Sequence, residues 1–105
     1  MRASPRVLAE IEVRYGVQDE RILGRGFDLS ESGIGFRGEK LFPGGTTVEI
    51  EFRIGSAHAE WFKVKGVVRH TRNGQMGVEF IEMSESVKLR IRKVVFHELA
   101  IQQLG

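Results

Sequence analysis

Alternation of apolar and polar residues, in short runs broken by turn signals, constrains this 105-residue chain most strongly. In the clearest run, at residues 47–54, every second side chain from Val48 to Ile54 is apolar. A period of two is typical of a β-strand with one buried face. Five further segments of this kind lie at residues 7–15, 21–29, 34–36, 60–72 and 76–81.

The connections between these segments are short and rich in turn-forming residues. Residues 30–33 (SESG) and 43–45 (PGG) are turn sequences, and Asn73-Gly74 is the preferred two-residue type I′ hairpin turn. Gly24 and Gly26 indicate a bend or bulge within the second segment. Six strands with short connections predict an all-β fold, an antiparallel sheet that closes into a barrel over residues 7–82.

The last segment has helical periodicity. Ser84 or Ser86 can cap a helix over residues 84–103. One face of this helix is expected to pack on the barrel, and it carries Val87, Ile91, Val94, Val95 and Leu99. The opposite face carries Leu89, Phe96, Ala100 and Leu104. This second stripe predicts a surface for a partner protein or a second copy, unless Phe96 folds over the rim of the barrel.

Composition excludes several classes of protein. The chain has no cysteine, which excludes disulfides, thiolate nucleophiles and Cys-ligated metals. Its 16 Lys and Arg and 14 Asp and Glu are evenly spread, unlike the basic footprint of a duplex-binding protein. No apolar run is long enough to span a bilayer, and the N-terminus lacks a secretory signal pattern. We therefore expect a single cytoplasmic domain.

Enzyme signatures are missing from the sequence. His58, His70 and His97 have no metal-ligand spacing, and no nucleophile or phosphate-loop motif occurs. A GxGxxG match at residues 33–38 lies on a strand pattern without a following helix, so it does not indicate a dinucleotide-binding unit. We expect no catalytic activity, no metal and no cofactor.

Two groups of residues are candidates for ligand binding. Arg2 and Arg6 lie on a terminal arm, residues 1–6, that Pro5 keeps from forming a helix. Arginine suits bidentate binding of phosphate or of a guanine edge. Asp28 and the turn that follows it offer a carboxylate, a hydroxyl at Ser30 and a glycine at position 33. Each group alone also fits a plain alternative, a solvated terminus and an ordinary β-turn.

Together, Arg2-xxx-Arg6 and Asp28-x-Ser30-xx-Gly33 resemble the motifs of the PilZ domain family, bacterial receptors for cyclic di-GMP. Residues 66–69 and 73–80 are similar to the last two strands of that family. The resemblance covers essentially the whole chain, residues 1–105. It implies a six-stranded antiparallel PilZ-type split barrel with a C-terminal helix and a ligand on its outer surface.

By the same resemblance, Arg2 and Arg6 would contact phosphates and guanine, and Asp28 would accept hydrogen bonds from a guanine edge. Ser30 would hold guanine or phosphate, and Gly33 would let the turn approach the ligand. The arm is expected to order when the ligand binds and to pass this change to a partner or an attached domain. Met1 stands where the family often has a further basic residue, so the number of ligands bound per domain, one or two, stays open.

Two rival functions stay open at the level of sequence. The first is a ligand-independent adaptor in pilus, motility or exopolysaccharide regulation that acts through Leu89, Phe96 and Leu104. The second is a barrel that binds single-stranded nucleic acid. Such barrels need exposed aromatic rings on a basic groove, and Trp61 is the one obvious candidate.

Overall fold

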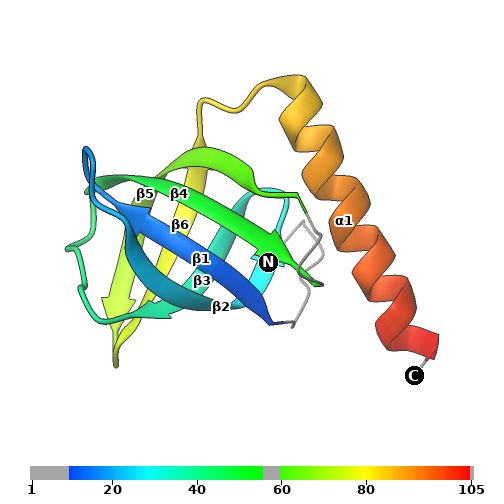
Figure 1. The fold of residues 1–105 in the computed structure, drawn as a ribbon, viewed down its shortest axis with the longest axis horizontal. Coiled ribbons are helices and arrows are strands. Elements are labelled where there is room, and N and C mark those ends of the chain that lie inside the picture. Colours follow the sequence, from blue (N-terminus) through cyan, green and yellow to red (C-terminus); the bar gives the residue numbers. More distant parts are fainter. Residues whose placement is uncertain (1–9, 56–59, 105) are drawn as a thin grey trace.

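Six antiparallel strands and a C-terminal helix make up the part of the chain that the computed structural model describes, residues 10–55 and 60–104 (Figure 1). The order of elements agrees with the sequence prediction, and the helix lies beside one end of the barrel (Figure 1). The elements are β1 (Ile11–Gly16), β2 (Ile22–Ser30), β3 (Gly33–Gly38), β4 (Thr47–Ile54), β5 (Phe62–Arg72), β6 (Gln75–Ile81) and α1 (Glu85–Leu104).

The strands form a closed barrel in the order β1-β2-β3-β6-β5-β4, which confirms the predicted barrel. Two strands contain bulges. In β2 the register shifts between Gly26 and Asp28, where the glycines of the sequence indicated a bend. In β5 it shifts between Val68 and His70, and the sequence analysis did not predict this second bulge. Bulges redirect side chains and sharpen the local twist of a strand.

Alternation along the strands places the apolar side chains inside the barrel, where aromatic rings dominate. The Tyr15 and Phe36 ring centroids lie 4.7 Å apart, and Phe52 stacks on Phe62 at 5.2 Å and on Phe80 at 5.8 Å. Removing one such buried ring by substitution with alanine costs about 3–5 kcal/mol. The core is therefore rigid enough to hold features of the outer surface in fixed positions.

The hairpin between β5 and β6 turns at Asn73 and Gly74, whose φ angles are +54° and +76°. Positive φ at both central residues defines the type I′ turn that the sequence predicted. At the start of α1 the Ser84 hydroxyl oxygen accepts a hydrogen bond from the Val87 amide at 3.2 Å, so Ser84 is the N-cap.

Helix α1 packs on the barrel through its predicted face. Ile91 and Val95 are buried, and Val87, Val94 and Leu99 are partly buried against the core. On the opposite face Leu89 is 45% exposed and Phe96 is 51% exposed, so Phe96 does not fold over a barrel rim. The side chain of Leu104 lies outside the described part of the structure.

Within the described residues, no helix has the length and apolar character needed to cross a membrane.

Candidate ligand-binding groove

Two glycines form the floor of a groove on the outside of the barrel. Gly35 in β3 pairs directly with Gly77 in β6. On either side, Asp28 pairs with Gly35 and His70 pairs with Gly77. The row Asp28–Gly35–Gly77–His70 therefore crosses four strands, and each of its outer residues directly follows a bulge. The two bulges thus bring the side chains of Asp28 and His70 close over the two glycines.

The neighbouring side chains lean over this floor. A Cβ atom added to Gly35 would lie 3.1 Å from Asp28 Oδ1 and from two carbons of the Phe27 ring, and one added to Gly77 would collide with the His70 imidazole. The groove has a volume of about 450 Å³. The missing side chains at these two positions leave room for Phe27, Asp28 and His70 to lie close to the backbone, and Gly35 is buried beneath its neighbours.

The turn between β2 and β3 forms one wall of the groove. Ser30 is fully buried, and its hydroxyl oxygen accepts a hydrogen bond from the Ser32 amide at 3.2 Å. Ser32 is exposed and lines the groove, and its carbonyl accepts from the Phe80 amide at 2.9 Å. A Cβ on Gly33 would lie 2.5 Å from the Val78 carbonyl oxygen. Ser30 thus shapes the turn, Ser32 faces the groove, and Gly33 allows β3 to approach β6.

Charged and amide groups lie along the other wall. Arg69 Nε and Glu79 Oε1 form an ion pair at 2.6 Å. With the Gln75 amide oriented so that its oxygen faces Arg37, that oxygen accepts from two guanidinium nitrogens at 2.9 and 3.3 Å. The groove therefore combines carboxylate acceptors with guanidinium donors, which suits a polar ligand with anionic groups.

The structure brings together some of the residues that the sequence singled out. Asp28 and Gly33 line the groove, and Ser30 lies directly behind its wall. Arg2 and Arg6 lie outside the described residues. Ser32, Gly35 and the residues on the β5 and β6 side were not predicted from the sequence to belong to the site. A sequence signal for Gly35 and Gly77 exists, since both are glycines at outward positions of strands, but their pairing depends on a register that only the structure gives.

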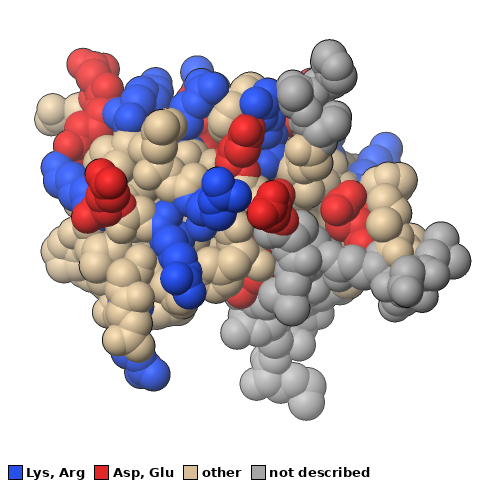
Figure 2. Space-filling model, turned by 60° about the horizontal axis from the view of Figure 1, so that its bottom comes forward, with Lys and Arg blue, Asp and Glu red and all other residues tan. Residues whose placement is uncertain are grey.

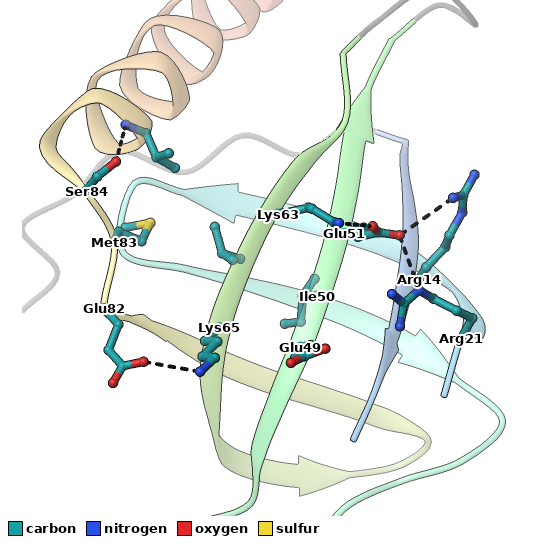
Figure 3. Close-up of a pocket in the computed structure, with 12 residues that line it drawn as sticks. Arg14, Arg21, Glu49, Ile50, Glu51, Lys63, Lys65, Glu82, Met83 and Ser84 are labelled. Atoms are coloured by element: carbon teal, nitrogen blue, oxygen red, sulfur yellow. Dashed lines mark hydrogen bonds and ion pairs between the residues drawn. The ribbon is translucent and has the colours of Figure 1, made fainter. Parts of the chain in front are cut away.

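A larger cavity, of about 570 Å³, lies over β1, β4, β5 and the segment before α1 (Figure 3). Three cationic side chains converge there on Glu51, at 3.6 Å for Arg14 and Lys63 and 3.7 Å for Arg21. We regard the glycine-floored groove as the better candidate because Asp28 and Gly33, two of the residues that the sequence singled out, line it.

Trp61 does not offer a free stacking face of the kind that a single-stranded nucleic acid needs. The guanidinium carbon of Arg14 lies 3.9 Å from the centre of the Trp61 ring system, and that of Arg53 lies 4.6 Å from it. Figure 2 also shows Lys and Arg interspersed with Asp and Glu on the face it presents. The tryptophan is thus part of a cluster of cations and acids.

Within residues 10–55 and 60–104, no group of three or more His, Asp or Glu residues is arranged to hold a metal ion.

Comparisons with known proteins identify the fold. The family model of the PilZ domain matches residues 1–97. Inhibitor of motility (MotI/DgrA) from Bacillus subtilis superposes with a TM-score of 0.82 at 17% identity, over 95% of this chain and 52% of that one. The PilZ domain of YcgR from Escherichia coli, determined with c-di-GMP, gives a TM-score of 0.76 at 18% identity, over 97% and 94%.

A longer YcgR chain from Escherichia coli, in complex with c-di-GMP, gives a TM-score of 0.82 at 18% identity, over 97% of this chain and 47% of that one. The present chain therefore spans about half of MotI/DgrA and of the longer YcgR chain. No curated protein sequence matches the chain.

Proposed function

This chain belongs to the PilZ domain family, and from that premise we propose that it is a receptor domain for cyclic di-GMP. PilZ domains are receptor or effector domains and not enzymes. The observation that carries the proposal is the groove, because it is bordered by Asp28 and by the turn at residues 30–33 that match the family's second motif. The same dinucleotide is bound by YcgR, a protein of the same fold.

The chemistry of cyclic di-GMP fits the groups that border the groove. A guanine presents N–H donors on its Watson–Crick edge, and the Asp28 carboxylate is suited to accept them. The planar base would lie against the Phe27 and His70 side chains that cover the two glycines, and the Ser32 hydroxyl would face it from the turn. In this proposal Ser30 acts through Ser32, because its own hydroxyl is buried in the turn.

The phosphates are assigned to Arg2 and Arg6 of the terminal arm. Their guanidinium groups would bind phosphate in two-pronged fashion and close the arm over the ligand. The domain would then present a changed surface to a partner or an attached domain. In this proposal the ligand phosphates supply the partners of both guanidinium groups, so closure of the arm depends on the ligand.

Calorimetric titration with cyclic di-GMP tests this proposal and gives the molar ratio, one or two ligands per domain. Arg6→Ala should weaken binding about 5- to 150-fold, as expected for the loss of one bidentate contact of about 1–3 kcal/mol. Its melting temperature without ligand should stay unchanged. Arg21→Ala, in the cavity around Glu51, is a matched control that should bind normally. Absence of binding by the wild type contradicts the proposal.

Asp28→Ala separates recognition of guanine from capture of an anion. If Asp28 contacts guanine, this variant should lose its preference for cyclic di-GMP over cyclic di-AMP. If the variant still prefers cyclic di-GMP as strongly as the wild type, the role assigned to Asp28 is wrong.

A second candidate function is supported by the outer face of α1. Leu89 and Phe96 lie seven residues apart and are about half exposed, as a surface for a protein partner or a second copy requires. In this alternative the domain is an adaptor in pilus, motility or exopolysaccharide regulation. No heat on titration with cyclic di-GMP, together with dimerisation that Phe96→Glu abolishes, would favour it.

A further inference from the structure

An ion pair joins the groove-lining turn to the C-terminal helix. Glu31 lies between Ser30 and Ser32 in the turn, and Arg92 lies on α1, 61 residues later in the chain. Arg92 Nε donates to Glu31 Oε2 at 2.8 Å, and Arg92 Nη2 donates to Oε1 of the same carboxylate at 3.3 Å. Two parallel hydrogen bonds fix the orientation of a carboxylate as well as its position.

Each end of this ion pair is attached to a hydrogen-bonded or buried part of the fold. In the turn, the Ser30 hydroxyl accepts from the Ser32 amide, and the Ser32 carbonyl accepts from the Phe80 amide. On the helix, Ile91 precedes Arg92 directly and is completely buried, and α1 packs near β2. A displacement of the turn would therefore be transmitted to the helix through the ion pair, and a displacement of the helix would be transmitted to the turn.

We propose that Glu31 and Arg92 are positioning residues for the ligand groove. Their ion pair holds the turn so that Ser32 and Gly33 keep the geometry that borders the groove, and it makes α1 sensitive to whether the groove is occupied. This inference rests on the proposed function, since it assigns a coupling to the same site. Because coupling between two equilibria is reciprocal, a ligand that fixes the turn also tightens α1 against the barrel.

The expected effect is modest. The side chain of Arg92 is 49% exposed and that of Glu31 is 32% exposed. Ion pairs of this exposure contribute little, so the expected change in affinity is at most about fivefold. A measurable effect of this size is expected here because the pair is two-pronged and both of its ends are held.

A double-mutant cycle tests the coupling. Arg92→Ala should weaken binding of cyclic di-GMP about two- to fivefold in the wild-type background and should have no effect in Glu31→Ala. A direct attraction between Arg92 and the phosphates would instead persist in Glu31→Ala, and that result would overturn the proposal. The exchanged pair Glu31→Arg with Arg92→Glu should bind better than Arg92→Ala. Arg90→Ala is the matched control, because Arg90 on the same helix pairs with Glu60.

Hydrogen exchange supplies a second readout, which does not depend on ligand affinity. Without ligand, Arg92→Ala should speed exchange of the Ser32 and Gly33 amides, whereas Arg90→Ala should not. With cyclic di-GMP, α1 amides should gain protection in the wild type and less in Arg92→Ala. Unchanged exchange in the turn of Arg92→Ala would contradict the positioning role. Failure of the wild type to bind would instead reject the proposed function, and the ligand-free measurement would still decide the role of the pair.

Discussion

Gly35, which is buried beneath its neighbours, gives the sharpest prediction about the ligand. Gly35→Ala adds one methyl group. The new Cβ would lie 3.1 Å from Asp28 Oδ1 and from the Phe27 ring, so it would press on the carboxylate that is proposed to bind guanine. N–H···O hydrogen bonds require donor–acceptor distances of about 2.7–3.2 Å, so a carboxylate that this methyl group displaces loses its contact with the guanine.

The magnitude follows from that contact. Losing one pair of hydrogen bonds to a base edge costs about 1–3 kcal/mol, so Gly35→Ala should weaken cyclic di-GMP binding about 5- to 150-fold. The fold should persist, because the φ angle of Gly35 is not in the left-handed region. The lower entropy of the unfolded chain stabilises such variants by about 0.4–1 kcal/mol and offsets the tight contact. The melting temperature should therefore change by less than about 5 °C.

Calorimetric titration and thermal unfolding of the same samples check both parts. Gly44→Ala is the matched control, because a Cβ there would meet its nearest atom, the Arg69 carbonyl oxygen, at an ordinary 3.5 Å. That variant should bind like the wild type. If Gly35→Ala is folded and binds cyclic di-GMP with full affinity, the ligand does not depend on Asp28 as positioned beside Gly35, and the proposed binding mode is wrong.

Two further predictions concern the turn and the acid stability of the domain. Ser30→Ala removes the buried acceptor of the Ser32 amide, so it should lower the free energy of unfolding by about 0.5–1.5 kcal/mol and weaken ligand binding. Denaturant unfolding and calorimetric titration would measure the two effects. A variant with the stability and affinity of the wild type would contradict the role of the turn. The Lys40 ammonium and the Val17 amide hold the pKa of Glu20 below its usual 4.5. The ionised Glu20 carboxylate therefore stabilises the fold above pH 4.5, and this stabilisation is lost as the pH falls through the lowered pKa. Glu20→Gln should have a lower melting temperature than the wild type at pH 7, and the two proteins should have the same melting temperature in acid. Equal melting temperatures at pH 7 would refute this.

Local sequence rules were sufficient for most of the fold. Alternation placed Phe52 and its neighbours inside the barrel because a strand with one buried face admits only one register of inward positions. Asn73-Gly74 was predicted correctly because only residues that tolerate positive φ build a type I′ turn. The helix face with Ile91 and Val95 followed from its 3.6-residue period.

The site was only partly predictable, because it depends on which strands pair and in which register. The bulge before His70 carries no glycine or proline of its own, so nothing local marks it. The pairing of Gly35 with Gly77 and the contact of Glu31 with Arg92 join residues far apart in the chain. Ser30 was chosen as a ligand contact from its motif, and only the structure places its hydroxyl inside the turn.

Mapping of backbone amide chemical shifts during titration with cyclic di-GMP tests the central claim most directly. We expect the largest shifts on the amides of Asp28, Ser32, Gly35 and Gly77, while the amides around Glu51 in the cavity over β1 and β4 stay unchanged. Saturable shifts centred on Glu51, or no shifts at ligand concentrations well above those that saturate known receptors, would contradict it.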